Sequence, residues 1–210
     1  MASRPADANR ALFTAARAPY RSAMFGPFYL IVAGLWVVWF VTWHIAALWC
    51  DKPTARAPRR SYRLHVVIVA LGVALTFGVF PRFEQPLWQV APGLGWAMVA
   101  LALAGIAFAW WARAHLGRLW SGGIERMERH RVVDSGPYAL VRHPIYTGLI
   151  AALVAAAVVH ATPLALAGPV LFALGFGLKA KVEERFLDAE IGGYGEYRRR
   201  VPMLVPFSPR

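Results

Sequence analysis

Long apolar runs dominate the sequence and restrict its fold more than any other feature. The run FYLIVAGLWVVWFVTWHIAALW, residues 28–49, has 22 residues, of which only His44 titrates near neutral pH. A helix that crosses a bilayer needs about 20 predominantly apolar residues. Two further runs of this kind cover residues 64–80 and 93–112. We therefore expect residues 28–112 to form three transmembrane helices.

Two shorter apolar segments follow, residues 145–161 and 163–178, separated only by Thr162. Their spacing predicts a helical hairpin over residues 145–178, with each arm at the lower limit of bilayer length. The sequence thus predicts an all-α integral membrane protein with about five transmembrane helices, of which the last two form the short hairpin. A soluble protein with five buried helices would need polar stripes along them, and these runs have almost none. No strand is expected, because the apolar runs are too long and are divided by Gly and Pro.

Lysine and arginine residues gather on one side of this expected topology. Residues 50–63, residues 113–144 and the tail from Lys179 hold 18 of the 23 Lys and Arg residues. The positive-inside rule places these segments, and with them the C-terminus, in the cytoplasm. The formal charge of +12 then indicates topology and contact with anionic membrane lipid. Nucleic acid is not an expected partner, since a nucleic-acid binder would need a soluble basic face.

Three further features limit the class of protein. The single cysteine, Cys50, excludes an internal disulfide and a cysteine metal cluster, and we expect no metal site. Residues 1–27 form an N-terminal tail in which a short interfacial helix is expected. Twenty arginines against three lysines, with abundant alanine, suggest a bacterial source with a GC-rich genome, and hence the bacterial inner membrane.

Polar residues are concentrated in two segments that flank the predicted hairpin, residues 126–148 and residues 178–206. An antiparallel hairpin brings the pair Arg142–His143 opposite the pair Glu183–Glu184 near membrane depth. Ionisable residues at that depth are costly and usually have a partner or a task. Each feature alone has a simpler explanation, such as a headgroup contact or a lysine pair at helical spacing. Their convergence at one end of one hairpin favours a functional site.

The motif HRVVDSGPYALVRHPIYTG, followed by EERFL and YGEYRRRVP, resembles the isoprenylcysteine carboxyl methyltransferase family. Membrane enzymes that methylate phospholipid amines share much of the pattern. The resemblance runs from His130 to the C-terminus, whereas the three N-terminal helices match only in hydropathy. It implies an integral membrane methyltransferase with S-adenosylmethionine (SAM) as methyl donor. Residues 113–210 would then be the SAM-binding catalytic region, its site formed on the cytoplasmic face by the loop before the hairpin and the C-terminal segment.

The resemblance also implies site residues. The cofactor would be bound by His130, Arg131, Val132, Val133, Tyr138, His143, Pro144, Ile145, Tyr146 and Glu183. Backbone groups freed by Gly136 and Pro144 are expected to contribute hydrogen bonds to it. Catalytic roles are assigned to Arg142, Lys179 and Glu184. Lys179 stands where the family usually has an arginine, and it keeps the charge but loses the bidentate fork.

The expected acceptor is lipophilic, an isoprenylcysteine-like carboxylate or a related lipid that enters from the bilayer. A Rossmann-type cofactor site is excluded, because no Gly-x-Gly-x-x-Gly follows a strand. Three other functions stay open: a phospholipid amine N-methyltransferase, a membrane lipid or sterol-type reductase, and a non-catalytic membrane assembly factor. The reductase would need a larger basic pocket for a pyrophosphate. No oligomeric state is predicted.

Overall fold

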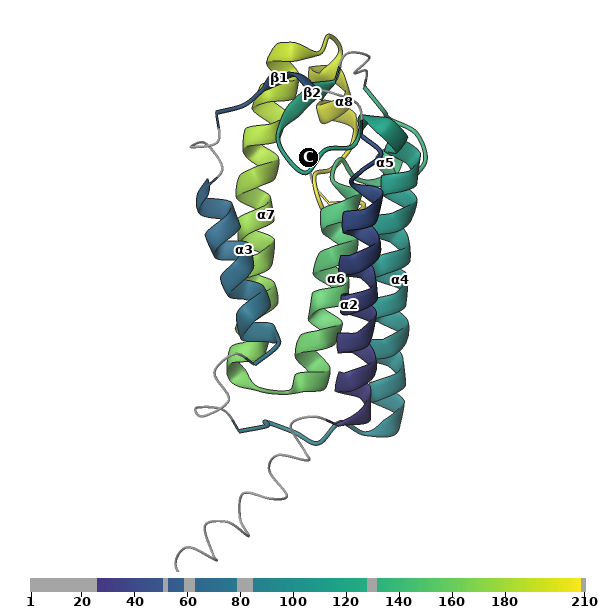
Figure 1. Cartoon of the computed structure of the whole chain (residues 1–210), viewed down its shortest axis with the longest axis vertical. Coiled ribbons are helices and arrows are strands. Elements are labelled where there is room, and N and C mark those ends of the chain that lie inside the picture. The colour runs from purple at the N-terminus through teal and green to yellow at the C-terminus, as the bar shows by residue number, and fades with distance from the viewer. Residues whose placement is uncertain (1–25, 51–52, 59–62, 79–84, 128–131, 209–210) are drawn as a thin grey trace, which may run out of the picture.

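The computed structural model of the chain is mostly helical (Figure 1). It describes residues 26–50, 53–58, 63–78, 85–127 and 132–208. The interfacial helix expected in the N-terminal tail falls on residues 1–25, outside the described residues. The elements are α2 (Pro27–Ala46), β1 (Pro53–Arg56), α3 (Arg63–Thr76), α4 (Pro92–Leu116), the 3-10 turn η3 (Gly117–Leu119), β2 (Glu125–Met127), α5 (Pro137–Leu140), α6 (Pro144–His160), α7 (Pro163–Glu190) and α8 (Tyr194–Arg200).

Three of the described helices are long and apolar enough to cross a membrane: α2, the continuous stretch Pro92–Leu119, and α7. Two shorter apolar helices, α3 and α6, have 14 and 17 residues. The second predicted span was expected over residues 64–80, and α3 ends earlier, at Thr76. The chain is thus a largely helical protein of membrane type, and the sequence located each apolar helix of its described part.

The second arm of the hairpin is much longer than predicted. It was expected to end at residue 178, but α7 continues to Glu190 and has 28 residues. The continuation KAKVEERFLDAE contains neither Gly nor Pro and is rich in strong helix formers, so nothing in it stops the helix. Glu183 and Glu184 therefore lie inside α7 rather than after it. Because successive helical residues point about 100° apart, the two carboxylates face different neighbours.

The expectation that no strand would form is wrong. β1 pairs with β2 as an antiparallel ribbon, with Pro53, Ala55 and Arg56 opposite Met127, Arg126 and Glu125. Strands of four and three residues are too short to produce a periodic sequence signal. The ribbon links the segment after α2 to the segment after α4, so two distant parts of the chain meet at one end of the helices.

Two pairs of helices pack closely through glycine. α3 packs against α7, and a Cβ on Gly72 would lie 2.7 Å from the carbonyl oxygen of Gly168. α4 packs against α6, where Gly105 and Gly148 face each other's backbone. Small residues of this kind let membrane helices approach until their backbones touch.

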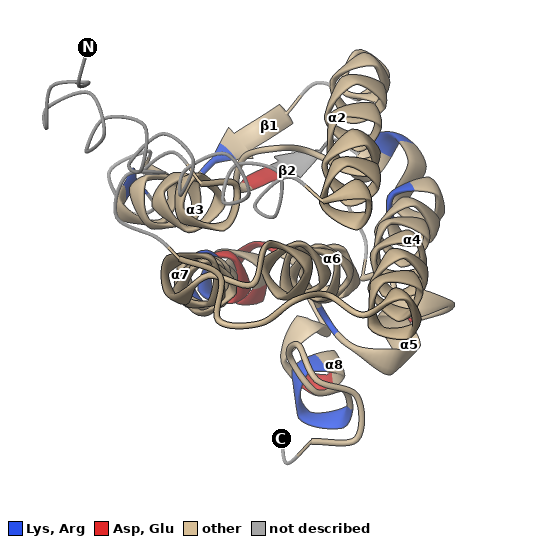
Figure 2. Ribbon diagram, turned by 90° about the horizontal axis from the view of Figure 1, so that it is seen from below, with Lys and Arg blue, Asp and Glu red and all other residues tan. Residues whose placement is uncertain are grey.

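The connections place the polar segments together. Figure 1 shows β1, β2, α5 and α8 at one end of the bundle, and the short α6–α7 connection at the other. α2 packs on α4 and α6, whereas α3 packs mainly on α7 and less extensively on α6. Figure 2 shows α2 and α3 on one side and α6 and α7 on the other, with β1 and β2 seen between α2 and α3.

Candidate functional site

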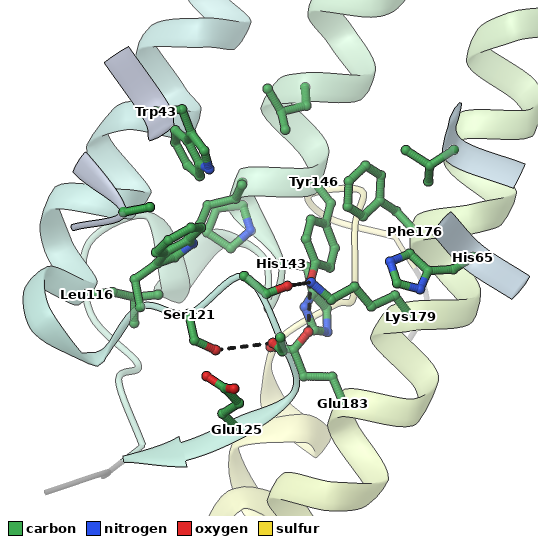
Figure 3. Close-up of a pocket in the computed structure, with 18 of the residues that line it drawn as sticks. Trp43, His65, Leu116, Ser121, Glu125, His143, Tyr146, Phe176, Lys179 and Glu183 are labelled. Atoms are coloured by element: carbon green, nitrogen blue, oxygen red, sulfur yellow. Dashed lines mark hydrogen bonds between the residues drawn. The ribbon is translucent and has the colours of Figure 1, made fainter. Parts of the chain in front are cut away.

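A cavity of about 1040 Å³ lies among these helices. Its lining comes from α2, α3, α6, α7 and the segment 116–125, with contributions from α5 and α8. Aromatic and aliphatic side chains form a long apolar part, including Trp36, Phe40, Trp43, Val73, Phe77 and Phe172. Polar side chains gather at the end nearest the strands: Ser121, Glu125, His143, Lys179 and Glu183 (Figure 3). The cavity therefore has a charged end and an apolar shaft.

Glu184 anchors the start of α6 to α7. Its carboxylate is buried, accepts a 2.7 Å hydrogen bond from Nε of Arg142, and lies 3.1 Å from Nε2 of His143. The Arg142 guanidinium also donates through Nη1 to the carbonyl oxygens of Arg198 and Val201. These contacts join α6, α7 and the α8 region around one buried ion pair.

Glu183 faces the cavity. The Tyr146 hydroxyl donates to its Oε2 at 2.8 Å. The Tyr146 ring is stacked on His143, with 5.1 Å between centroids, and on Phe176, with 4.3 Å. Glu183 belongs to the cavity lining and Glu184 does not. The two carboxylates therefore have different surroundings: Glu183 faces the cavity, and Glu184 joins α7 to the start of α6.

Lys179 lies one turn before Glu183 on α7 and is 7% exposed. Its Nζ donates to the carbonyl oxygen of Gly122 at 3.0 Å and lies 5.5 Å from the centroid of the Tyr146 ring. On the strand side, Glu125 forms a 3.0 Å ion pair with Arg56. An ammonium group therefore lies at the charged end, close to the loop that precedes β2.

Three tyrosines outside the apolar helices contribute neutral surfaces. Burial raises the pKa of Tyr138, Tyr194 and Tyr197, and the negative charge of Glu183 raises the pKa of Tyr138 further. The Tyr197 hydroxyl donates to the carbonyl oxygen of Tyr138 at 2.8 Å, which joins α8 to α5. All three line the cavity as uncharged rings, so the charges at this end are those of the carboxylates and the cations.

Most of the predicted site residues meet at the cavity. The lining includes Val132, Val133, Tyr138, Arg142, His143, Pro144, Ile145, Tyr146, Lys179 and Glu183. Gly136 lies outside it: its φ is 58°, and an added Cβ would lie 2.8 Å from Cε1 of His115. Gly136 shapes the turn into α5 and carries no cavity surface. His130 and Arg131 fall outside the described residues.

The opposite wall of the cavity was not predicted from the sequence. That wall consists of Trp36, Trp43 and neighbouring residues of α2, His65 of α3, and the loop with Ser121 and Glu125. Two signals were present in the sequence. Trp36 and Trp43 are seven residues apart and so share a helical face, and His65 is an ionisable residue in an apolar helix.

These features define a class: an integral membrane protein whose helices enclose a cavity with a charged end and an apolar shaft. The model of the isoprenylcysteine carboxyl methyltransferase family matches residues 98–189. Protein-S-isoprenylcysteine O-methyltransferase B of Arabidopsis thaliana is 31% identical over 152 residues, which cover 70% of this chain and 75% of that protein. The chain therefore belongs to the isoprenylcysteine carboxyl methyltransferase family, as its C-terminal motifs indicated.

Two bacterial relatives have other names. Methanethiol S-methyltransferase 2 of Bradyrhizobium diazoefficiens is 30% identical over 172 residues, 75% of this chain and 63% of that protein. Cobalt-zinc-cadmium resistance protein CzcN of Cupriavidus metallidurans is 31% identical over 111 residues, 52% of this chain and 49% of that protein. The chain thus spans less than two thirds of either protein. Within the described residues, no group of three or more His, Cys, Asp or Glu side chains is placed to hold a metal ion.

Proposed function

We propose that the protein is a SAM-dependent methyltransferase that acts on a lipophilic acceptor at the cytoplasmic face of the membrane. The observation that carries this proposal is the form of the cavity, with charged groups at one end and an apolar shaft behind them. Pockets that hold one drug-sized ligand measure about 300–1,000 Å³. At about 1040 Å³, this cavity lies at the upper end of that range, and we propose that the methyl donor and part of a second, apolar molecule share it.

The residues at the charged end fit SAM. Glu183 would accept hydrogen bonds from the ammonium or the ribose hydroxyls of SAM. The rings of Tyr138 and Tyr146 provide aromatic faces for the adenine or the sulfonium cation. SAM supplies an activated methyl group on a positively charged sulfur. The protein's task is to hold the acceptor in line with that methyl group and to exclude water.

Lys179 is the residue that suits an anionic acceptor. Arg142 is held by Glu184 and by two carbonyl oxygens, so its charge serves mainly to join α6, α7 and α8. Lys179 lines the cavity beside Tyr146, where its ammonium would attract a carboxylate or another anion. We therefore assign the positioning of the acceptor to Lys179, and a bracing role to Arg142 and Glu184.

The acceptor would enter from the bilayer between α2 and α3. Val37 and Phe40 of α2 and Val69 of α3 all line the cavity, and the main packing partner of α2 is α4 whereas that of α3 is α7. We further propose five membrane crossings, with α3 and α6 as short spans and the C-terminus in the cytoplasm. The apolar composition of both helices and the location of the basic segments at one end of the bundle support this topology.

The other functions are less well supported. A nicotinamide-dependent reductase needs cations for a pyrophosphate, and the described cavity lining offers Lys179 and the already paired Arg142. A phospholipid amine methyltransferase fits the aromatic lining but would have to deprotonate its acceptor. A non-catalytic assembly factor would have no need of SAM.

Two measurements test the proposal. The protein purified in detergent should bind SAM in a calorimetric titration, and membranes that contain it should transfer a labelled methyl group from SAM to one lipid fraction. SAM binding without label transfer to any lipid fraction would refute a lipid acceptor. Lack of SAM binding by folded protein would refute the methyltransferase.

A further inference from the structure

His65 is an imidazole in the wall of the cavity that faces α7. It belongs to the first turn of α3, is 8% exposed and lines the cavity. α3 approaches α7 closely there, since a Cβ on Gly175 would lie 3.2 Å from the carbonyl oxygen of His65. Figure 3 shows the ring of His65 turned into the cavity beside Lys179 and Phe176. This is the level at which the charged end meets the apolar shaft.

That level is where an acceptor with an apolar body would present its reactive atom. Its chain would occupy the shaft, and its head would reach the charged end that Lys179 and Glu183 form with Tyr146. His65 approaches this point from the wall opposite His143. The nearby imidazole of His143 helps to hold α6 against α7, because its Nε2 lies 3.1 Å from Glu184 and its ring is stacked on Tyr146.

The chemistry of the acceptor decides whether a base is needed. A carboxylate is already an anion at neutral pH and can attack a methyl group directly. A thiol is mostly protonated, since a free cysteine thiol has a pKa of about 8.5. Its sulfur becomes a strong nucleophile only when the proton leaves, and a base at the reaction point is then required.

On the basis of the proposed methyltransferase function, we propose that His65 is the general base for a thiol acceptor with an apolar chain. The thiol gives its proton to an imidazole nitrogen of His65, and the resulting thiolate lies beside the Lys179 ammonium. Its sulfur forms a bond to the methyl carbon of SAM as the bond from that carbon to the sulfonium sulfur breaks. The bonding electron pair stays on the donor sulfur, and the imidazolium later loses its proton to water. The products are a methyl thioether and S-adenosylhomocysteine.

Three acceptors of the same chain length separate this role from a structural one: dodecanethiol, thiododecanoic acid and dodecanoic acid. The thiol needs a base, whereas the thioacid offers an already ionised sulfur and the acid an ionised oxygen. General-base catalysis contributes about 100- to 10,000-fold. We therefore expect His65→Gln to lower kcat/KM for the thiol about 100-fold more than kcat/KM for the thioacid. Raising the pH should restore part of the thiol rate in the variant, because solvent then removes the proton.

The matched control is His44→Gln. His44 also lines the cavity, but its Nδ1 lies 2.7 Å from the carbonyl oxygen of Phe40 on its own helix. This variant should leave the ratio of thiol to thioacid rates as in the parent protein. An equal loss on all three acceptors in His65→Gln would show a structural role and overturn the proposal.

The outcome for the parent protein separates the two proposals. Transfer to the thioacid and the acid but not to the thiol would overturn the role of His65 and leave the methyltransferase intact. Transfer to none of the three, together with lack of SAM binding, would overturn the methyltransferase itself.

Discussion

At the scale of single residues, the adjacent carboxylates of α7 have different environments and should have different functions. Glu183 lines the cavity and accepts a hydrogen bond from Tyr146, whereas Glu184 is buried against Arg142 and His143. One is placed to bind a ligand and the other to hold the site together. Conservative substitutions at the two positions should separate ligand affinity from stability.

Glu183→Gln should weaken SAM binding tenfold or more with little loss of stability. The change keeps the size of the side chain but removes a charge-assisted hydrogen bond, worth about 1.5–3 kcal/mol. Isothermal titration of the purified protein with SAM measures the affinity, and a thermal melt of the same sample measures stability. Unchanged affinity would remove Glu183 from the cofactor site.

Glu184→Gln should instead lower the stability of the protein more than its affinity for SAM. It leaves the Arg142 guanidinium buried without its counter-charge, and breaking a buried pair in this way costs about 3–5 kcal/mol. We expect a clearly lower unfolding temperature and a smaller effect on SAM affinity than for Glu183→Gln. Negligible effects of both substitutions on affinity and on stability would refute both roles.

At the scale of elements, Arg142 holds α8 against the helical bundle. A lysine has one ammonium group and cannot reach Glu184 together with the carbonyl oxygens of Arg198 and Val201. Arg142→Lys should therefore speed amide hydrogen exchange in residues 194–201 and lower methyl transfer about tenfold or more, since a small misplacement of a site can cost that much. Expression and membrane insertion should be unchanged.

The control for this substitution is Arg198→Lys. The Arg198 side chain forms a 3.7 Å surface ion pair with Asp188, a kind of contact worth about 0–1 kcal/mol. Its backbone carbonyl remains in place as the acceptor for Arg142. If Arg142→Lys behaved like this control, the motif RHP would mark a membrane boundary rather than a site.

Helix packing gives a second prediction at this scale. Gly148→Ala places a methyl group against the backbone of α4 near Gly105, and overpacking of this kind costs about 1–3 kcal/mol. Gly34→Ala is the matched control, because a Cβ on Gly34 meets nothing within 4 Å and alanine is the better helix former. Thermal melts in detergent should show a lower unfolding temperature for Gly148→Ala alone. Equal melting temperatures would mean that α4 and α6 are less closely packed.

At the scale of the whole molecule, the cavity depends on both halves of the chain. α6 and α7 carry the residues that the family motifs indicate, while α2, α3 and the segment before β2 supply the facing wall. The β1–β2 ribbon joins two segments of that facing wall at the charged end. α6 and α7 therefore contain most of the recognisable site but only one side of the cavity.

Membrane topology is the prediction that belongs to this scale. A reporter fused after Arg210 should lie in the cytoplasm, and one inserted before Phe28 should lie on the opposite side. The physical reason is the concentration of Lys and Arg in the segments at one end of the bundle. Both reporters on one side would require an even number of crossings, and α3 or α6, the two short helices, would then not span the bilayer.

Three properties could be predicted from the sequence alone: that the chain is a helical membrane protein, where its described apolar helices lie, and to which family it belongs. These follow from the length and composition of continuous segments and from local motifs, neither of which requires knowledge of distant contacts. It also indicated most of the α6 and α7 site residues, because they belong to such motifs.

Contacts between distant segments determine which carboxylate faces the cavity, that Arg142 braces α8, and that His65 and Trp43 form the opposite wall. The sequence patterns also did not predict the full length of α7 or the β1–β2 ribbon. The physical reason is the same in each case. The direction of a side chain depends on how its helix is rotated about its axis relative to the neighbouring helices. A short strand is stabilised by a partner strand about seventy residues away in the chain.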